Sequence, residues 1–251
     1  MTASPDPPAP AEYIAALDAT WPPEAVRRIG PFALREGAEG GGGRVTAATA
    51  EAPADEGVLD SAEAALRAAG RRPVFRLRSG ACPWDGALDD LLAARGYARH
   101  DPTILLAAPV GHLRSEEPAG LRYFPLWPPL AIQRRIWADH GIGDARQAVM
   151  ARVTGPKTAL LARISDRPAG VAFVACHGRI AMLHAMQVAP ALQRKGAARN
   201  LMQGAADWAA GEGAAWLALA VTEQNAAARG LYEGLGMTEV TAYHYRVAPE
   251  V

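Results

Sequence analysis

The stretch that decides the fold runs from Val188 to Ala198 and reads VAPALQRKGAA. Apolar residues over 180–188 predict a strand before it, and helical spacing over 193–210 predicts a long helix after it. The stretch therefore carries the chain from a strand into the first turn of a helix. Alternation of strands and helices through the rest of the chain indicates a mixed α/β fold.

The start of this helix is a suitable place for a phosphate group. The first backbone N–H groups of a helix have no intrahelical acceptor, and the helix dipole is positive there. Gly196 lets a ligand approach the backbone, and the small side chains of Ala197 and Ala198 leave that approach open. Arg194 and Lys195 add positive charge. A single glycine is equally typical of an ordinary helix N-terminus, so both interpretations stand on these residues alone.

A second informative stretch, NAAARGLYEGLGM, covers residues 225–237. Asn225 is a favourable N-cap. One helical face carries Ala228, Leu231, Tyr232 and Leu235. Because Tyr232 lies two turns after the cap, we expect its hydroxyl to point along this face toward the neighbouring strand. A core tyrosine with a satisfied hydroxyl is the alternative interpretation.

Together, the two stretches resemble the motifs of the GNAT superfamily of acetyl-CoA-dependent N-acetyltransferases. The family carries [Q/R]-x-x-G-x-[G/A] at the start of its long helix, which reads QRKGAA from Gln193 to Ala198 here. Its second motif, N-x-x-A-x-x-L-Y-x-x-x-G-F, matches residues 225–237, with Met237 in place of the usual aromatic residue. The resemblance covers about residues 121–251 and implies a GNAT-like α/β fold with a mixed sheet.

The resemblance implies that acetyl-CoA is the co-substrate, and it indicates which residues would bind it. The backbone of Gln187 and Val188 would pair with the pantetheine arm, and the amides of residues 194–199 would surround the pyrophosphate. The expected acetyl-CoA-binding residues are Gln187, Val188, Gln193, Arg194, Lys195, Gly196, Ala197, Ala198, Arg199 and Asn225.

The same resemblance implies direct transfer, in which an amine attacks the thioester carbonyl and Tyr232 protonates the departing thiolate. For the base that takes the proton of the amine we expect His184, because an imidazole titrates near neutral pH. Strand alternation predicts that His184 and Val188 face the same way. Glu223, just before the second motif, is the other candidate base. A buried, hydrogen-bonded histidine remains an equal alternative for His184.

The composition argues against several other classes of protein. The 251 residues contain 26 Lys+Arg and 26 Asp+Glu, so no net charge attracts nucleic acid or an anionic membrane. The two cysteines, Cys82 and Cys176, are too few for a disulfide scaffold or a cysteine-rich zinc module, and we expect no metal. No apolar run reaches the roughly 18 residues that cross a bilayer. The Pro-rich beginning does not look like a secretory signal, so we expect a cytoplasmic protein without nucleic-acid or membrane partners.

The sequence predicts two domains. We expect a disordered tail over residues 1–11, a first domain over 12–110, a linker over 111–120 and a second domain over 121–251. In the first domain we expect helices over 13–21, 61–69 and 88–95 and strands over 32–35, 44–46, 74–78 and 103–107. In the second we expect helices over 129–139, 144–153, 193–210 and 225–235 and strands over 159–164, 169–175, 180–188, 215–221 and 243–247. We interpret Gly40–Gly43 as a hairpin tip, since the Lys-Ser/Thr pair of a phosphate loop is lacking.

An internal repeat relates the two halves. At an offset of 140 residues, Gly96 coincides with Gly236 and Leu92 with Tyr232. With one residue of slippage, Gly70 coincides with Gly211. Leu92 has no proton to donate, so we expect the first half to be a catalytically inactive GNAT-like copy and the chain to be a tandem of two such domains.

These expectations combine into an N-acetyltransferase whose acceptor is a primary amine of a small molecule, an amino acid or a peptide N-terminus. The alternative is a non-catalytic acyl-CoA-binding or regulatory module, because an intact phosphate loop suits both. Basic residues on the two helices before the strand at 159–164 would either bind an acidic substrate or face solvent. They are Arg134, Arg135, His140, Arg146 and Arg152. The oligomeric state stays open, with a homodimer as one option.

Overall fold

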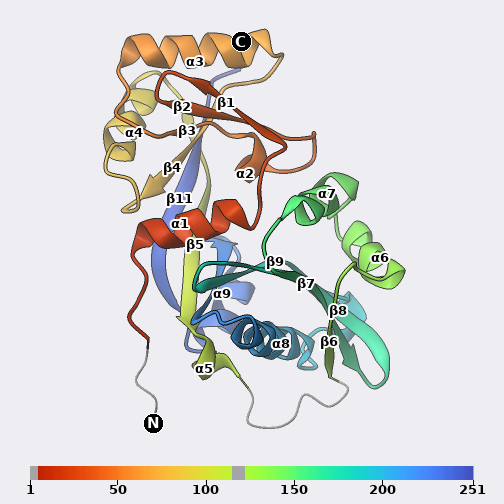
Figure 1. Ribbon diagram of the computed structural model, residues 1–251. Coiled ribbons are helices and arrows are strands. Elements are labelled where there is room, and N and C mark those ends of the chain that lie inside the picture. The colour runs from red at the N-terminus through yellow and green to blue at the C-terminus, as the bar shows by residue number, and fades with distance from the viewer. Residues whose placement is uncertain (1–4, 115–121, 251) are drawn as a thin grey trace.

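The computed structural model describes residues 5–114 and 122–250, in which a large mixed sheet spans the molecule (Figure 1). Its eight strands lie in the order β4-β11-β5-β10-β9-β8-β7-β6. Their bounds are β4 Val74–Ser79, β5 Ala98–Pro109, β6 Tyr123–Leu126, β7 Lys157–Ile164, β8 Arg167–His177, β9 Ile180–Val188, β10 Trp216–Thr222 and β11 Thr238–Val247. All neighbours are antiparallel except β9 and β10, which run parallel.

Three further strands form a small antiparallel sheet in the first half: β1 Ala25–Ile29, β2 Phe32–Glu36 and β3 Thr49–Ala50. The helices of the first half are α1 Pro10–Ala19, α2 Gly43–Thr46, α3 Glu56–Ala68, α4 Asp85–Ala94 and α5 Val110–Leu113. Those of the second are α6 Ala131–Asp139, α7 Asp144–Arg152, α8 Ala197–Gly211 and α9 Ala226–Glu233, with a 3-10 turn over Pro190–Leu192. Figure 1 shows α3, α4 and the small sheet at one end of the molecule and α8 with β6–β9 at the other.

Apolar side chains on both faces of the large sheet explain why helices cover both. Alternate residues of β9 point to opposite faces, so Leu183 joins the core under α5, α8 and α9. Met182 instead joins the core under α1. On this second face, α6 and α7 contribute Trp137 and Val149 to a further core with Phe173 of β8. The sheet is therefore buried between two helical layers.

The internal repeat appears as a repeated order of elements. The first copy runs α3, β4, α4, β5, and the second runs α8, β10, α9, β11. The last strand of each copy pairs with the first strand of the other, because β5 pairs with β10 and β11 pairs with β4. The order β4-β11-β5-β10 is therefore symmetric. Replacing each strand by its counterpart in the other copy gives the same order in reverse. The mixed α/β fold and its tandem organisation are confirmed, and one continuous sheet joins the halves.

Helix ends in the two copies have matching hydrogen bonds. After α4, the Tyr97 amide donates to the Leu92 carbonyl at 3.0 Å, and after α9 the Met237 amide donates to the Tyr232 carbonyl at 3.1 Å. Leu92 and Tyr232 therefore occupy equivalent positions, as predicted.

The glycines that end α3 and α8 correct the predicted alignment. Gly70 has φ 69° and Gly213 has φ 81°, and each follows its helix with the same pair of backbone hydrogen bonds. The predicted match of Gly70 with Gly211 is therefore wrong by two residues, because α8 continues through Gly211 before it ends.

The segment after β2 differs from its predicted structure. Residues 44–46 belong to the short helix α2 and not to a strand, and the Ala47 amide donates to the Gly43 carbonyl at 2.8 Å. Gly40–Gly43 leads into this helix, so the predicted hairpin tip is also wrong. A Cβ on Gly43 would lie 2.7 Å from the ring of Tyr245. This close approach to β11 is a tertiary contact that periodicity does not reveal.

The predicted tail and linker on either side of the first domain also contain regular structure. Helix α1 begins at Pro10, inside the stretch predicted to be disordered. The Asp6 carbonyl accepts hydrogen bonds from Arg179 at 3.0 Å and from Trp216 at 3.2 Å. Helix α5 occupies the start of the predicted linker, while residues 1–4 and 115–120 of the predicted tail and linker lie outside the described residues. No described helix is both long and apolar enough to span a bilayer.

Candidate active site

The parallel strands β9 and β10 separate partway along their length. Their pairing ends at Leu183 opposite Leu219, although β9 continues to Val188 and β10 to Thr222. A hollow opens on each face of the sheet at this separation. Val188 lines one of them, and Ala185 and Thr222 line the other.

A β-bulge in β9 decides which side chains face which hollow. Ala185 has φ 51°, and the register between β8 and β9 gains an extra β9 residue there. His184 consequently lies against Trp21 and Phe173, whereas Val188 packs with the core under α8. The prediction that His184 and Val188 face the same way is wrong, because the bulge interrupts strand alternation between them.

The first hollow, which we call the α8 cleft, lies between the starts of α8 and α9 and has a volume of about 810 Å³. Seven predicted acetyl-CoA-binding residues line it: Val188, Gln193, Arg194, Gly196, Ala197, Ala198 and Arg199. The remaining lining residues come from α9 and the turn after it: Ala226, Ala227, Ala228, Gly230, Leu231 and Gly234. Residues about 30 positions apart in sequence thus form a single cleft.

Backbone amides at the start of α8 are available to an anionic ligand. The first intrahelical bond runs from the Asn200 amide to the Gly196 carbonyl at 2.9 Å, so the first three helical amides have no acceptor within the helix. Gly196 has φ 89°, which favours glycine, and a Cβ there would project into open space. Three exposed cations surround this turn and make no ion pair within residues 5–114 and 122–250: Arg194, Lys195 and Arg199.

The other three predicted acetyl-CoA-binding residues lie beside the α8 cleft rather than in its wall. Asn225 caps α9 as predicted, because its side-chain oxygen accepts a hydrogen bond from the Ala228 amide at 3.1 Å. Gln187 is half-buried on β9 opposite Val171 of β8. Lys195 is exposed in the turn before Gly196.

Tyr232 lies on the buried face of α9. It is 6% exposed and belongs to the core under α8, while its neighbour Leu231 lines the α8 cleft. Burial raises the pKa of Tyr232 to about 12. Its hydroxyl therefore keeps its proton at neutral pH, which is the form that a general acid requires.

His184 is buried, and both of its ring nitrogens are hydrogen-bonded. A guanidinium nitrogen of Arg44 donates to Nδ1 at 3.0 Å, and because guanidinium is never an acceptor, Nδ1 carries no proton. Nε2 consequently donates its proton to Oγ1 of Thr20 at 2.8 Å, and that hydroxyl donates to the Ala16 carbonyl at 2.6 Å.

This environment keeps His184 neutral. Burial, and then the charge of Arg44, lower the pKa of His184 well below its ordinary value. The lone pair that would take a proton faces a cation. This arrangement suits a residue that orients Arg44 better than it suits the predicted general base.

Glu223, the other predicted base, is exposed at the end of β10. Its amide donates to the Pro102 carbonyl at 2.9 Å, which joins the end of β10 to the beginning of β5. The residues on either side of this contact, Thr222, Asp101 and Thr103, line the second hollow. Glu223 therefore lies beside that hollow with a solvated carboxylate.

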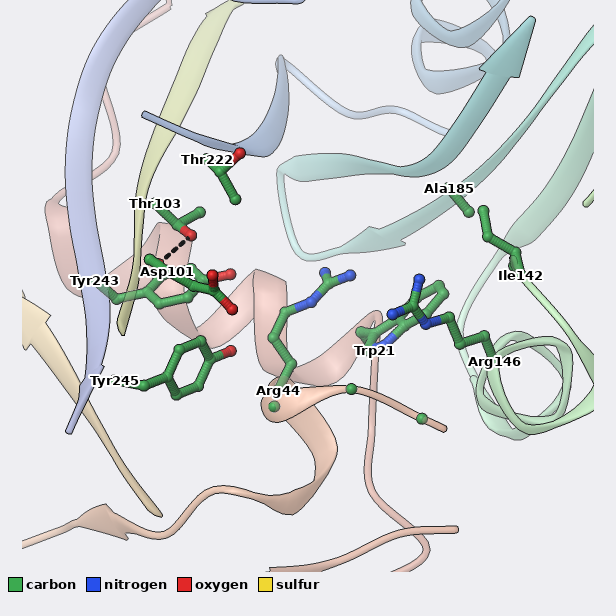
Figure 2. Close-up of a pocket in the computed structure, with 13 residues that line it drawn as sticks. Trp21, Arg44, Asp101, Thr103, Ile142, Arg146, Ala185, Thr222, Tyr243 and Tyr245 are labelled. Carbon is green, nitrogen blue, oxygen red and sulfur yellow. Dashed lines mark hydrogen bonds between the residues drawn. The ribbon is translucent and has the colours of Figure 1, made fainter. Parts of the chain in front are cut away.

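The second hollow, which we call the interface pocket, lies between the two halves and has a volume of about 240 Å³ (Figure 2). Its lining residues from the first half are Trp21, Gly41, Gly42, Gly43, Arg44, Asp101 and Thr103. Those from the second half are Ile142, Arg146, Ala185, Thr222, Tyr243 and Tyr245. Sequence reasoning identified only Arg146 among its charged residues. For the other charged residues of the pocket, the available signal in the sequence was the run of glycines before Arg44.

The basic residues predicted on the two helices before β7 lie in different surroundings. Arg146 faces the interface pocket. Arg152 pairs with Glu24 at 3.2 Å. Arg135 is largely exposed and lies 4.0 Å from Asp139. The two alternatives, a binding site for an acidic substrate and a solvent-facing surface, therefore apply to different residues. Arg146 lines a pocket, while Arg135 faces solvent.

Comparisons with known proteins agree with this architecture. The acetyltransferase (GNAT) family model matches residues 122–237. A GCN5-related N-acetyltransferase from Kribbella flavida superimposes with a TM-score of 0.73 at 20% identity, over 96% of each chain. A functionally unknown conserved protein from Staphylococcus epidermidis has a TM-score of 0.66 at 10% identity, over 94% of this chain and 97% of its own.

A tandem GNAT protein from the clavulanic acid biosynthesis pathway superimposes with a TM-score of 0.61 at 15% identity, over 99% of this chain and 90% of its own. No curated protein matches the chain in sequence. The structural likenesses establish the fold, and the family match supports acyl transfer in general. Residues 122–237 therefore match the acetyltransferase (GNAT) family, within a fold like that of a tandem GNAT protein.

Proposed function

We propose that the protein transfers an acetyl group from acetyl-CoA to a primary amine. The observation that carries this proposal is the α8 cleft, where free helix amides and a left-handed Gly196 stand beside exposed cations. Such a turn binds a pyrophosphate through backbone N–H groups and charge. The cleft adjoins the place where β9 and β10 separate, so the acyl end of the co-substrate would lie at that separation.

In the reaction, the neutral amine attacks the thioester carbonyl, a C–N bond forms and the C–S bond breaks. Tyr232 gives its proton to the departing thiolate, a role supported by its high pKa and its place on α9 beside Leu231 of the cleft. Backbone amides near the bulge at Ala185 would stabilise the oxyanion. The proton lost by the amine passes to solvent through Glu223, while His184 holds Arg44 in place.

The test is calorimetric titration of the purified protein with acetyl-CoA, beside Gly196→Glu and Gly213→Glu. Both glycines have positive φ, 89° and 81°, and both face open space at opposite ends of α8. The two variants therefore share backbone strain and added charge, and only Gly196→Glu places a carboxylate among the amides. We expect micromolar binding in the wild type and Gly213→Glu and its loss in Gly196→Glu.

Binding without release of free coenzyme A, across a panel of amines, would instead indicate the non-catalytic acyl-CoA-binding module. Absence of binding by the wild-type protein would overturn the proposal. Equal loss in both variants would show that strain, and not the pyrophosphate site, accounts for the effect.

A further inference from the structure

We propose that the interface pocket binds the acceptor through Arg44 and Arg146, and that the acceptor is a small amine that carries a carboxylate, such as an amino acid. This inference rests on the proposed function, since it takes the amine to reach the thioester where β9 and β10 separate. It assigns a substrate class to a pocket that the two halves build jointly.

The two arginines of the pocket have no acidic partner among the described residues. Arg44 donates to the neutral His184 at 3.0 Å, and Arg146 donates to the Gly40 carbonyl at 3.3 Å. By contrast Arg152, on the same helix as Arg146, is paired with Glu24. Neither guanidinium group of this small pocket is therefore in an ion pair within the described residues, which favours an anionic ligand.

Both guanidinium groups are held in place before any ligand binds. The Arg44 guanidinium lies 4.7 Å from the centre of the Trp21 ring, in addition to its bond to His184. Arg146 is tied to the glycine loop by its bond to Gly40. A planar guanidinium matches the two oxygens of a carboxylate, and fixed side chains lose little entropy on binding.

The opposite wall carries negative charge. Figure 2 shows the Asp101 carboxylate and the Tyr245 hydroxyl pointing toward the space into which the Arg44 guanidinium extends. Asp101 has φ 45°, and the Thr103 hydroxyl donates to its backbone carbonyl at 2.8 Å, which holds the backbone at this position. Its exposed carboxylate lies 3.8 Å from His100. Two cations against one carboxylate leave one excess positive charge. An acceptor with a neutral, reactive amine and one carboxylate complements it.

The lining residues also orient the acceptor. Ala185 and Thr222 mark the separated ends of β9 and β10, so the amine belongs at that end of the pocket and the carboxylate at the arginines. A volume of about 240 Å³ suits a small molecule. Arg44 and Asp101 come from the first half, so the catalytically inactive copy would complete the acceptor site of the active one.

The experiment measures release of free coenzyme A with matched acceptors: amino acids, the amines that lack their carboxylate, and aminoalkyl phosphates. We expect kcat/KM at least 10-fold higher for amino acids than for the matched amines. Arg44→Gln and Arg146→Gln should each raise KM for amino acids at least 10-fold and leave KM for the matched amines and the Kd of acetyl-CoA unchanged. Arg135→Gln, which removes an exposed arginine of α6, is the matched control.

The outcomes separate the two proposals. If the wild type neither binds acetyl-CoA nor acetylates any amine, the proposed function fails. If it acetylates amines but treats amino acids and decarboxylated amines alike, or if Arg44→Gln and Arg146→Gln behave like Arg135→Gln, this inference alone is overturned. A preference for aminoalkyl phosphates would overturn the carboxylate assignment. Should Arg44→Gln unfold, Arg44→Lys keeps the charge without the planar fork, and Arg146→Gln remains an independent test.

Discussion

Nδ1 of His184 lies 3.0 Å from a guanidinium nitrogen of Arg44, a residue 140 positions earlier in the chain. The contact joins the bulged strand β9 of the acetyltransferase domain to helix α2 of the other half. A neutral imidazole holds a cation at the wall of the interface pocket, and Thr20 holds the imidazole in turn. The geometry therefore links the two halves at the place where we expect the acceptor to bind.

This contact predicts how stability depends on pH. Because the pKa of folded His184 is lowered below that of the unfolded chain, unfolding takes up a proton below about pH 6.5. The contribution of His184 is complete above that pH and declines as the pH falls toward the folded pKa. We expect the free energy of unfolding to lose up to about 1.4 kcal/mol per pH unit from this residue.

Chemical denaturation from pH 7.5 to 5 measures this slope. His184→Gln, whose amide can both accept from Arg44 and donate to Thr20, should have a shallower slope than the wild type. His177→Gln changes an exposed histidine and should keep the wild-type slope. Identical slopes in all three proteins would show that His184 does not govern the acid sensitivity.

Tyr232→Phe tests the proposed acid. Removal of the hydroxyl should lower kcat by roughly 100-fold, because the thiolate would leave without a proton donor. The Kd of acetyl-CoA should stay unchanged, because loss of one hydroxyl leaves the lining of the α8 cleft, including Leu231, in place. Tyr13→Phe is the matched control: Tyr13 is also buried, burial also raises its pKa to about 12, and it belongs to α1 on the opposite face of the sheet. Equal kcat in the two variants would remove Tyr232 from the mechanism.

The equivalent glycines of the two copies predict equal stability effects. Gly96 has φ 78° and Gly236 has φ 82°, and a Cβ at either faces open space. Alanine at either position should therefore cost about 1 kcal/mol through backbone strain alone. Gly86→Ala, inside α4 and also facing open space, should instead stabilise the fold by about 0.5–1 kcal/mol. Thermal unfolding of the three variants checks the signs. Opposite effects of Gly96→Ala and Gly236→Ala would contradict the equivalence, and stabilisation by both would contradict the strain.

Asp18 is expected to matter most among the charged residues of the first half. Its carboxylate accepts from Arg35 at 2.6 Å and from the fully buried Arg76 at 2.8 Å. Burial alone would raise the pKa of Asp18, but the charges of Arg76 and Arg35 outweigh it and lower that pKa. Asp18 therefore contributes stability above pH 4, and this stability is lost as the pH falls through the lowered pKa.

Asp18→Asn leaves Arg76 buried without a counter-charge and should destabilise the fold by about 3–5 kcal/mol at pH 7. Asp139→Asn, at an exposed carboxylate beside Arg135, should change stability by less than about 1 kcal/mol. Urea unfolding of both variants distinguishes these values. A similar small effect for both would show that the Asp18 pairs are energetically equivalent to surface ion pairs.

Features that depend on residues close together in the sequence were predictable. Asn225 caps α9 because a short side chain reaches the amide three residues ahead, wherever the helix packs. Gly196 and the glycines that end helices likewise follow from φ preferences of single residues. The helical period of α8 and the apolar runs of β9 and β10 indicated a mixed α/β fold, and the motifs at 193–198 and 225–237 carried the resemblance to the GNAT family.

The sequence by itself thus determined most local elements and the turn at the start of α8, because these depend on backbone chemistry within a few residues. It also predicted the equivalence of Leu92 with Tyr232, through the internal repeat. Tertiary structure decided the rest. The bulge at Ala185 reverses Val188 relative to His184, since strand pairing, not alternation, sets where a bulge lies. Strands β5 and β11 each pair with a strand of the other copy, and Arg44 contacts His184. These contacts join residues more than 100 positions apart. Their energies depend on tertiary packing, which no local sequence pattern encodes.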